Sequence, residues 1–232
     1  MATTTTTSWK GDSVHWPEAA LSRGDLRISG TATDTGISWH VARDENGGTT
    51  VALVGRRPRG ATTRRVDRVV RACAARCATP QRLAIELANY LCRGQTGVEI
   101  GVIRVGPEGR RIELLNVSLP TILHWDPALG LDTHAPLTTG IENLANAEVT
   151  TLELQPGALL LGLAGDMVSS AWDRDEIDRL VEGLSVRYFG GLIAASAPPE
   201  LHRLIESADT PAEEGSAGLV AVGLPPQGML SA

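Results

Sequence analysis

VALVGRRPRG, residues 51–60, decides the fold of this chain. It begins as a short apolar strand, turns at Gly55, and leads into residues 61–77, where apolar side chains recur at helical spacing. A strand that passes through a glycine-rich turn into a helix is a common scaffold for phosphate and metal sites. The turn carries no carboxylate, and its charged residues are Arg56, Arg57 and Arg59. The stretch therefore predicts such a scaffold without acidic ligands in its turn.

Blocks of strands and helix pairs are predicted on either side of this stretch. Turn signals and alternating apolar residues indicate strands at 26–30, 36–42, 49–54, 98–105, 110–118, 121–125, 148–154, 158–163 and 219–222. Helices are predicted at 61–77 and 80–93, and again from Asp173 and from Pro198. Because short turns separate them, 98–105 and 110–118 are predicted to pair, as are 148–154 and 158–163.

Length and composition favour one globular domain. The chain has 232 residues, of which 42% are hydrophobic and 21% charged. We expect a domain at 9–224, a disordered N-terminus at 1–8 and a flexible tail at 225–232. No apolar run is long enough to cross a membrane and no secretory signal is present, so we expect a cytoplasmic protein.

Charge is distributed unevenly along the chain, although the net charge is only −6. Residues 55–111 carry thirteen arginines against four acidic residues, a net charge of +9. Residues 112–232 carry four arginines against seventeen acidic residues, a net charge of −13. An acidic protein with a local basic face is a poor general binder of nucleic acid, and no aromatic residues are interleaved with these arginines.

The cysteines and histidines suggest no separate site. Cys73 and Cys77 share a helix face without further metal ligands nearby, which favours buried thiols in a reducing compartment. His40 and His124 each neighbour a tryptophan in a predicted strand, where structural histidines are the commoner case. No order of Ser, His and Asp typical of a hydrolase stands out.

Four phrases together resemble the metal-dependent (PPM-type) serine/threonine protein phosphatases, in particular the branch typified by the stage II sporulation phosphatase. They are VALVGRRPRG at 51–60, IELLNVSLPTILHW at 112–125, LQPGALLLGLAGDMVSS at 154–170 and EEGSAGLVAV at 213–222. The second resembles the family's asparagine-alanine-glycine-histidine turn, with Asn116 kept and Ser118-Leu119 in place of glycine-histidine. The resemblance implies an α+β fold, a four-layer α-β-β-α sandwich of two antiparallel sheets flanked by helix pairs.

The resemblance also implies a catalytic pair of manganese or magnesium ions held by aspartates. Matched to this chain, the ligand positions fall on Gly55, Gly165 and Ser216, with Asp166 one place beyond Gly165 as the residual candidate. We therefore expect a cleft without acidic side chains, no cofactor and no catalytic residue. The resulting hypothesis is a pseudophosphatase that binds proteins in phosphorylation-controlled partner switching. The alternatives are a weak or unconventional metal-dependent phosphatase, which would need Mn or Mg, and a structural subunit of a larger assembly.

The arginine cluster is the feature that could carry a retained binding function. Its members are Arg56, Arg57 and Arg59 in the turn, with Arg64, Arg65, Arg68 and Arg71 on the outer face of the following helix. They could replace the lost cation, or bind a phosphate or an acidic side chain. The alternative is that they form an ordinary solvent-exposed surface without a binding role. The resemblance implies a phosphoprotein partner of the STAS or anti-sigma type. Homodimerisation through residues 61–93 is also compatible with it.

Overall fold

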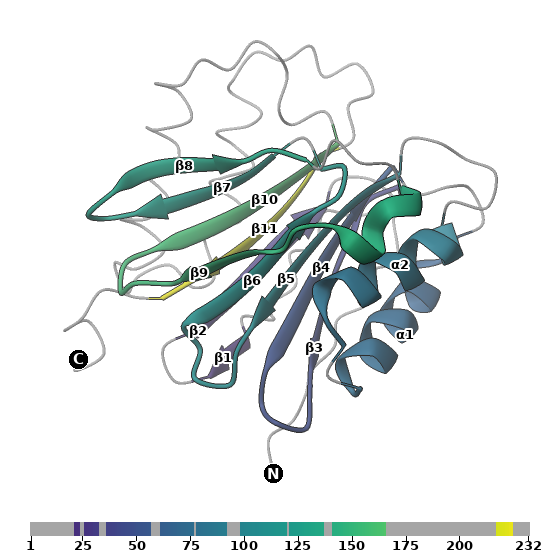
Figure 1. The fold of residues 1–232 in the computed structure, drawn as a ribbon, viewed down its shortest axis with the longest axis horizontal. Helices are drawn as coiled ribbons and strands as arrows, with labels where there is room; N and C mark the ends of the chain where they lie inside the picture. Colours follow the sequence, from purple (N-terminus) through teal and green to yellow (C-terminus); the bar gives the residue numbers. More distant parts are fainter. Residues whose placement is uncertain are drawn as a thin grey trace.

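The computed structural model describes residues 21–23, 26–32, 36–56, 61–76, 78–91, 98–119, 121–136, 141–165 and 217–224. Within them, the strands form two antiparallel sheets that lie face to face (Figure 1). Sheet A has the order β1 (Leu21–Arg23), β2 (Leu26–Ala32), β11 (Ala217–Gly223), β10 (Leu159–Gly165), β7 (Thr121–Asp126) and β8 (Gly130–His134). Sheet B has the order β3 (Ser38–Arg43), β4 (Thr49–Gly55), β5 (Glu99–Val105), β6 (Arg111–Asn116) and β9 (Thr150–Glu153).

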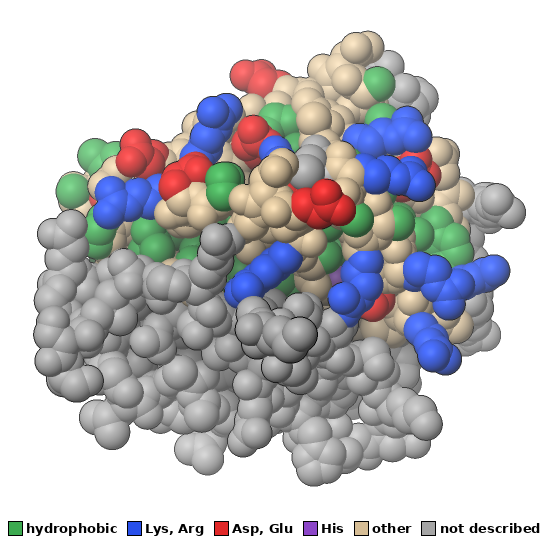
Figure 2. Space-filling model, turned by 90° about the horizontal axis from the view of Figure 1, so that it is seen from below, with side chains coloured by type: hydrophobic (Ala, Val, Ile, Leu, Met, Phe, Trp, Pro, Cys, Tyr) green, Lys and Arg blue, Asp and Glu red, His purple; other side chains and the backbone are tan. Residues whose placement is uncertain are grey.

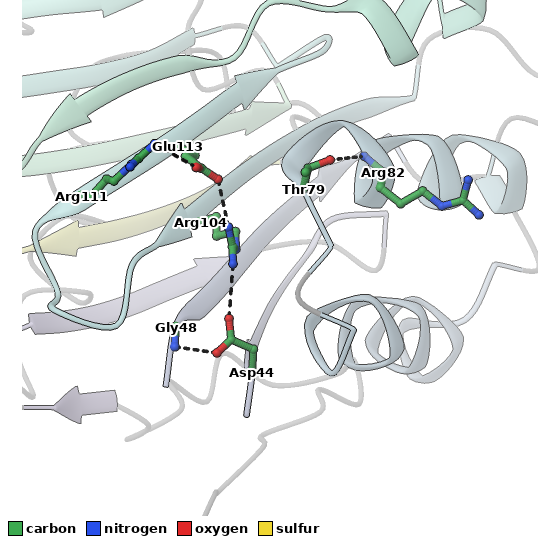
Figure 3. Close-up of polar contacts among 7 residues, drawn as sticks. All are labelled: Asp44, Gly48, Thr79, Arg82, Arg104, Arg111 and Glu113. Atoms are coloured by element: carbon green, nitrogen blue, oxygen red, sulfur yellow. Dashed lines mark hydrogen bonds and ion pairs between the residues drawn. The ribbon is translucent and has the colours of Figure 1, made fainter. Parts of the chain in front are cut away.

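Two helices, α1 (Thr63–Ala74) and α2 (Pro80–Leu91), cover the face of sheet B that is turned away from sheet A (Figure 1). A 3-10 helix, η1 (Ile141–Asn146), precedes β9. Threonine side chains cap both α-helices. Thr62 Oγ accepts from the Arg65 N–H at 3.3 Å. Thr79 Oγ accepts from the Arg82 N–H, also at 3.3 Å (Figure 3). The predicted helices from Asp173 and Pro198 lie outside the described residues.

Both faces of the central strands are buried, which explains their continuous apolar sequences. On β4, Val51 and Leu53 point into the core between the sheets, whereas Ala52 and Val54 pack against the helices. Val66, Val70, Leu83 and Leu87 fill the second core from the helix side. A strand enclosed on both faces favours apolar side chains, and all of β10 and residues 51–54 of β4 are apolar.

One predicted pairing is wrong. Residues 148–154 and 158–163 were expected to form a hairpin, but β9 pairs with β6 in sheet B and β10 pairs with β7 and β11 in sheet A. The physical reason is burial. All of β10 is apolar and buried, so it takes a central position, whereas β9 is largely exposed and takes an edge. The turn between them carries the chain from one sheet to the other.

An ion-pair network crosses sheet B near the β3–β4 turn (Figure 3). Arg104 on β5 lies 3.5 Å from Asp44 and 3.1 Å from Glu113 on β6, and Arg111 lies 3.7 Å from Glu113. Asp44 also accepts from the Gly48 N–H at 2.7 Å, which closes the turn. These ion pairs stabilise the end of sheet B that contains the β3–β4 turn. Gly55 and Glu99 lie at the opposite end of β4 and β5.

The fold class predicted from the sequence is confirmed: two antiparallel sheets with a helix pair on the outer face of one. The limits predicted for the N-terminal segment and the tail, 1–8 and 225–232, lie outside the described residues. Within the described part of the chain, no helix is long and apolar enough to cross a membrane.

Candidate functional site

Strand ends from both sheets meet at one edge of the molecule. Gly55, the last residue of β4, is paired across sheet B with Glu99, the first residue of β5. Gly165, the last residue of β10, reaches the same place from sheet A, and its N–H donates to Glu99 Oε2 at 2.7 Å. We call Gly55, Arg56, Glu99 and Gly165 the Glu99 junction. It brings together two of the three ligand positions expected from the sequence, Gly55 and Gly165.

Glu99 contradicts the expectation of an edge without acidic side chains. It is only 5% exposed, and its carboxylate lies between the two glycines. Burial of an unpaired carboxylate lowers the stability of the fold, so the partners of Glu99 are needed to offset its desolvation. Besides the Gly165 N–H, the Arg56 guanidinium pairs with it, with Nε 2.9 Å from Oε1. The sequence-based reasoning missed Glu99 because it lies at the start of a strand and belongs to no motif.

Gly55 leaves the space that the Glu99 carboxylate fills. A Cβ placed on Gly55 would collide with Glu99 Oε2 and would lie 3.1 Å from the Ala164 Cβ. An aspartate at position 55, as the phosphatase resemblance would require, therefore has no room beside the present Glu99. The Glu99 carboxylate, which comes from β5, lies close to the position that a Cβ of residue 55 would occupy.

The described residues at the junction do not fit a pair of divalent cations. Such a pair needs several carboxylates converging from different strands. Here Gly55 and Gly165 offer no side-chain oxygen, and the Glu99 carboxylate is engaged by a guanidinium and a backbone N–H. Nowhere in the described part of the chain do three or more His, Cys, Asp or Glu side chains group as a metal site would require. Asp166 and Ser216, the other predicted positions, lie outside the described residues.

Arg56 reaches Glu99 from a conformation that non-glycine residues rarely adopt. Its φ is +47°, and among the described residues no other non-glycine has a positive φ. A left-handed conformation costs roughly 1–2 kcal/mol for a residue with a Cβ. The side chain is 55% exposed, so its contact with Glu99 lies at the boundary between solvent and the protein interior. Arg57 and Arg59 lie outside the described residues.

The turn that replaces the family's asparagine-alanine-glycine-histidine phrase has a structural role here. Asn116 Nδ2 donates to the His134 carbonyl at 2.9 Å, and its Oδ1 accepts from the Leu119 N–H at 3.0 Å. The Ser118 hydroxyl donates to the Val98 carbonyl at 2.6 Å. The Leu119 side chain is fully buried in the core between the sheets. These contacts fix the crossing from β6 in sheet B to β7 in sheet A.

The outer face of α1 carries several arginines. Arg64, Arg65 and Arg68 are exposed, and the Arg65 guanidinium lies over the Tyr90 ring of α2, 5.8 Å from its centroid. Figure 2 shows Lys and Arg side chains gathered on the side of the molecule where α1 and α2 lie. Arg71 differs from the expectation of an exposed residue, because it is only 39% exposed and its Nε lies 2.8 Å from Asp67 Oδ2.

Beneath α1, three residues have the order of a hydrolase triad, which the sequence did not reveal. Ser38 Oγ lies 2.9 Å from His40 Nε2, and His40 Nδ1 lies 3.6 Å from Asp67 Oδ1. Ser38 and His40 are only 5% and 4% exposed, which leaves the serine without access for a substrate. Burial acts to raise the pKa of Asp67, but hydrogen bonds from His40 and Arg71 outweigh it and hold that pKa below its ordinary value. The group therefore attaches α1 to β3.

A second histidine pair lies on β7 and β8. The His124 and His134 rings stack with centroids 6.1 Å apart, and their Nε2 atoms are buried without a hydrogen-bond partner among the described residues. Burial lowers the pKa of both residues, and in His124 the neighbouring His134 lowers it further. The expectation that His40 and His124 are structural agrees with this geometry.

The arrangement of sheets and helices matches solved phosphatase structures. Magnesium-bound RsbX aligns with a TM-score of 0.56 and 9% identity, covering 88% of this chain and 98% of that one. The RsbU and RsbW domains of a Mycobacterium tuberculosis protein align with a TM-score of 0.60 and 11% identity, over 87% of this chain and 62% of that one. The Mycobacterium tuberculosis serine/threonine phosphatase PstP aligns with a TM-score of 0.51 and 14% identity, over 86% and 99%.

This chain has the fold of the PP2C (PPM) phosphatases. The structure of the PP2C domain of SpoIIE from Bacillus subtilis, with a fragment of its regulatory domain, also matches, with a TM-score of 0.58 and 13% identity. The chain spans 64% of that structure and 62% of the RsbU–RsbW structure, less than two thirds of each. No protein-family model matches the chain, and no curated protein matches its sequence. At these identities the likeness establishes the PP2C fold.

Proposed function

We propose that this chain is a protein-binding regulatory module on a PP2C phosphatase fold, a pseudophosphatase that acts in phosphorylation-controlled partner switching. The observation that carries the proposal is the Glu99 junction. The carboxylate there is paired with Arg56, and two of the expected ligand positions are glycine. The described residues of this edge offer no converging carboxylates, which two divalent cations need in order to activate water for attack on phosphorus.

The outer face of α1 supports a binding role. The first turn of α1 contains Arg64 and Arg65 and no acidic residue. Positive charge at a helix N-terminus opposes the helix dipole, at a cost of about 0.3–1 kcal/mol for each residue. The positions of these arginines are therefore unfavourable for the helix dipole, whereas a phosphorylated or acidic protein surface would be attracted to them.

The resemblance to the sporulation branch names the class of partner to test. Active members of that branch act on STAS-domain phosphoproteins, so a degenerate copy could bind such a protein or compete for it. RsbX, RsbU and SpoIIE structures are among the matches, which supports a place in the same kind of signalling. Homodimerisation through residues 61–93 stays a prediction.

Calorimetric titration tests the binding role. We expect a serine-phosphorylated STAS-domain protein to bind the wild type and to bind the triple variant Arg64→Glu, Arg65→Glu, Arg68→Glu at least about tenfold more weakly, a loss of about 1.4 kcal/mol. A matched control reverses the exposed Arg110, which lies in the β5–β6 turn away from α1. Equal affinity of the wild type and the triple variant would contradict the proposed surface.

A phosphatase assay tests the proposed loss of catalysis. We expect no turnover of a phosphoserine peptide with manganese or magnesium. Manganese-dependent turnover that Asp166→Asn abolishes would overturn the pseudophosphatase proposal and establish the conventional alternative.

One observation favours a second candidate, an unconventional metal-dependent phosphatase. Glu99 places a buried carboxylate next to the position of the missing aspartate at Gly55, and could serve as a ligand displaced from β4 to β5. This candidate predicts manganese-dependent turnover that Glu99→Gln abolishes. The pseudophosphatase proposal predicts no turnover in either protein.

A further inference from the structure

A buried carboxylate at an edge between two sheets requires positive charge. The Glu99 side chain is only 6% exposed, and removal of a carboxylate from water is unfavourable unless it is paired and hydrogen-bonded. In a metal-dependent phosphatase, divalent ions would supply the positive charge at the corresponding strand ends. In this chain, charge of the same sign comes from the side chain of Arg56.

The contacts of Glu99 connect three segments that are distant in sequence. Its Oε1 pairs with Arg56 Nε, directly after β4, and its Oε2 accepts from the Gly165 N–H at the end of β10. Glu99 itself begins β5. The carboxylate thus ties sheet B to sheet A at the edge where the chain leaves both sheets, which is what a bridging cation would otherwise do.

The local backbone accommodates this arrangement at a cost. Gly55 has no side chain where the carboxylate lies, and Arg56 adopts a positive φ directly after it. Such conformations persist only where the surrounding structure compensates for them, and they concentrate at functional sites. The ion pair with Glu99 is a contact that compensates for the conformation of Arg56.

We propose that Arg56 is a built-in cation, a guanidinium that replaces divalent metal at the junction and joins the two sheets through Glu99. The folded junction is then independent of metal ions. This inference rests on the same Glu99 junction as the proposed loss of catalysis, but it holds whether or not the face of α1 binds a partner.

A double-mutant cycle on Arg56 and Glu99 tests the proposal. We expect Arg56→Ala to lower the midpoint of thermal unfolding by about 3–6 °C, because a buried carboxylate loses its cation while the φ requirement at residue 56 is unchanged. In the background of Glu99→Gln, which removes the charge, the same substitution should cost less than half of that shift. Arg110→Ala, an exposed arginine outside the junction, is the matched control and should shift the midpoint little.

Metal dependence provides an independent readout. We expect the wild-type midpoint to be the same in EDTA and in millimolar manganese. Additive effects of the two substitutions, or a wild type stabilised by manganese, would overturn the proposal. If Arg56→Ala does not fold, Arg56→Gln, which removes the charge but keeps a long polar side chain, allows the same cycle. Failure of the α1 face to bind a phosphoprotein would change none of these results. Additive effects in the cycle would overturn the junction proposal alone, whereas stabilisation of the wild type by manganese would count against both proposals.

Discussion

An aspartate introduced at position 55 should destabilise the protein. In the variant Gly55→Asp, the new Cβ would collide with Glu99 Oε2, and two carboxylates would lie together in one partly buried space. If Glu99 stays, charges about 4 Å apart at an effective dielectric constant near 20 repel by about 4 kcal/mol. If Glu99 moves away, it gives up its contacts with Arg56 and Gly165, and a hydrogen bond to a charged group contributes about 1.5–3 kcal/mol. Either route predicts a loss of about 4 kcal/mol.

Two further variants separate crowding from charge. Gly55→Ala adds only the colliding methyl group, so we expect about 2 kcal/mol from overpacking alone. Combining Gly55→Asp with Glu99→Ala removes both the collision and the repulsion, and should recover at least half of the lost stability. Gln155→Asp introduces the same charge at an exposed position in the β9–β10 turn, at the opposite end of β10 from Gly165, and serves as the control.

Equilibrium urea unfolding measures these differences directly. For a chain of this size, 4 kcal/mol corresponds to a fall of about 8–16 °C in the thermal midpoint, so calorimetry provides a second measurement. A Gly55→Asp protein as stable as the wild type would refute the reasoning, because it would mean that Glu99 does not occupy the space beside Gly55.

Three other substitutions test the remaining polar groups. Burial lowers the pKa of His124 and His134 below 6.5, so at acidic pH the unfolded chain binds more protons than the folded one. The wild type should therefore lose stability as the pH falls below about 6.5. The variant His134→Leu should lose less over the same range, as measured by thermal midpoints at a series of pH values. The pKa of Asp67 is lowered below 3.8 in the folded protein, so the carboxylate stabilises the fold above that pH and this stabilisation is lost as the pH falls through the pKa of the folded state. Asp67→Asn should therefore reduce the free energy of unfolding by about 1–2 kcal/mol near neutral pH. The difference from the wild type should disappear in acid, as measured by urea unfolding across pH. Asn116→Ala removes the hydrogen bonds that hold the crossing turn and should cost about 1–3 kcal/mol in the same assay.

Elements with strong local signals could be predicted from the sequence. The run into Gly55 forms β4, Thr79-Pro80 begins α2 as its capping residues indicate, and the Gly106–Gly109 turn joins β5 to β6. In each case the information lies within a few neighbouring residues, as backbone conformation and capping require. β8 was missed because its polar sequence, GLDTH, shows no apolar alternation, and it pairs with β7 at the edge of sheet A.

Contacts between distant residues could not be predicted in this way. Glu99 and Gly165 are 66 positions apart, and no pattern in the sequence connects a strand-initial glutamate to a backbone N–H in the other sheet. The pairing of β9 was misjudged for a related reason: a short turn favours a hairpin locally, but burial of every residue of β10 decides which sheet it joins. The prediction of no acidic residue near Gly55 holds for the turn that contains Gly55. It is wrong for the surrounding space, because Glu99 comes from another strand.

Leu119 shows how such distant requirements limit what mutation can change. A Cβ on Gly101 of β5 would collide with its side chain, and a Cβ on Gly162 of β10 would also reach it, at 4.0 Å. A larger residue at Gly101 therefore demands a smaller one at 119, whereas a Cβ on Gly162 would be in ordinary contact with Leu119 and would crowd Val220 instead, at 3.1 Å. Relatives of this protein should vary positions 101 and 119 in concert, so paired changes at these positions would reveal that contact without any coordinates.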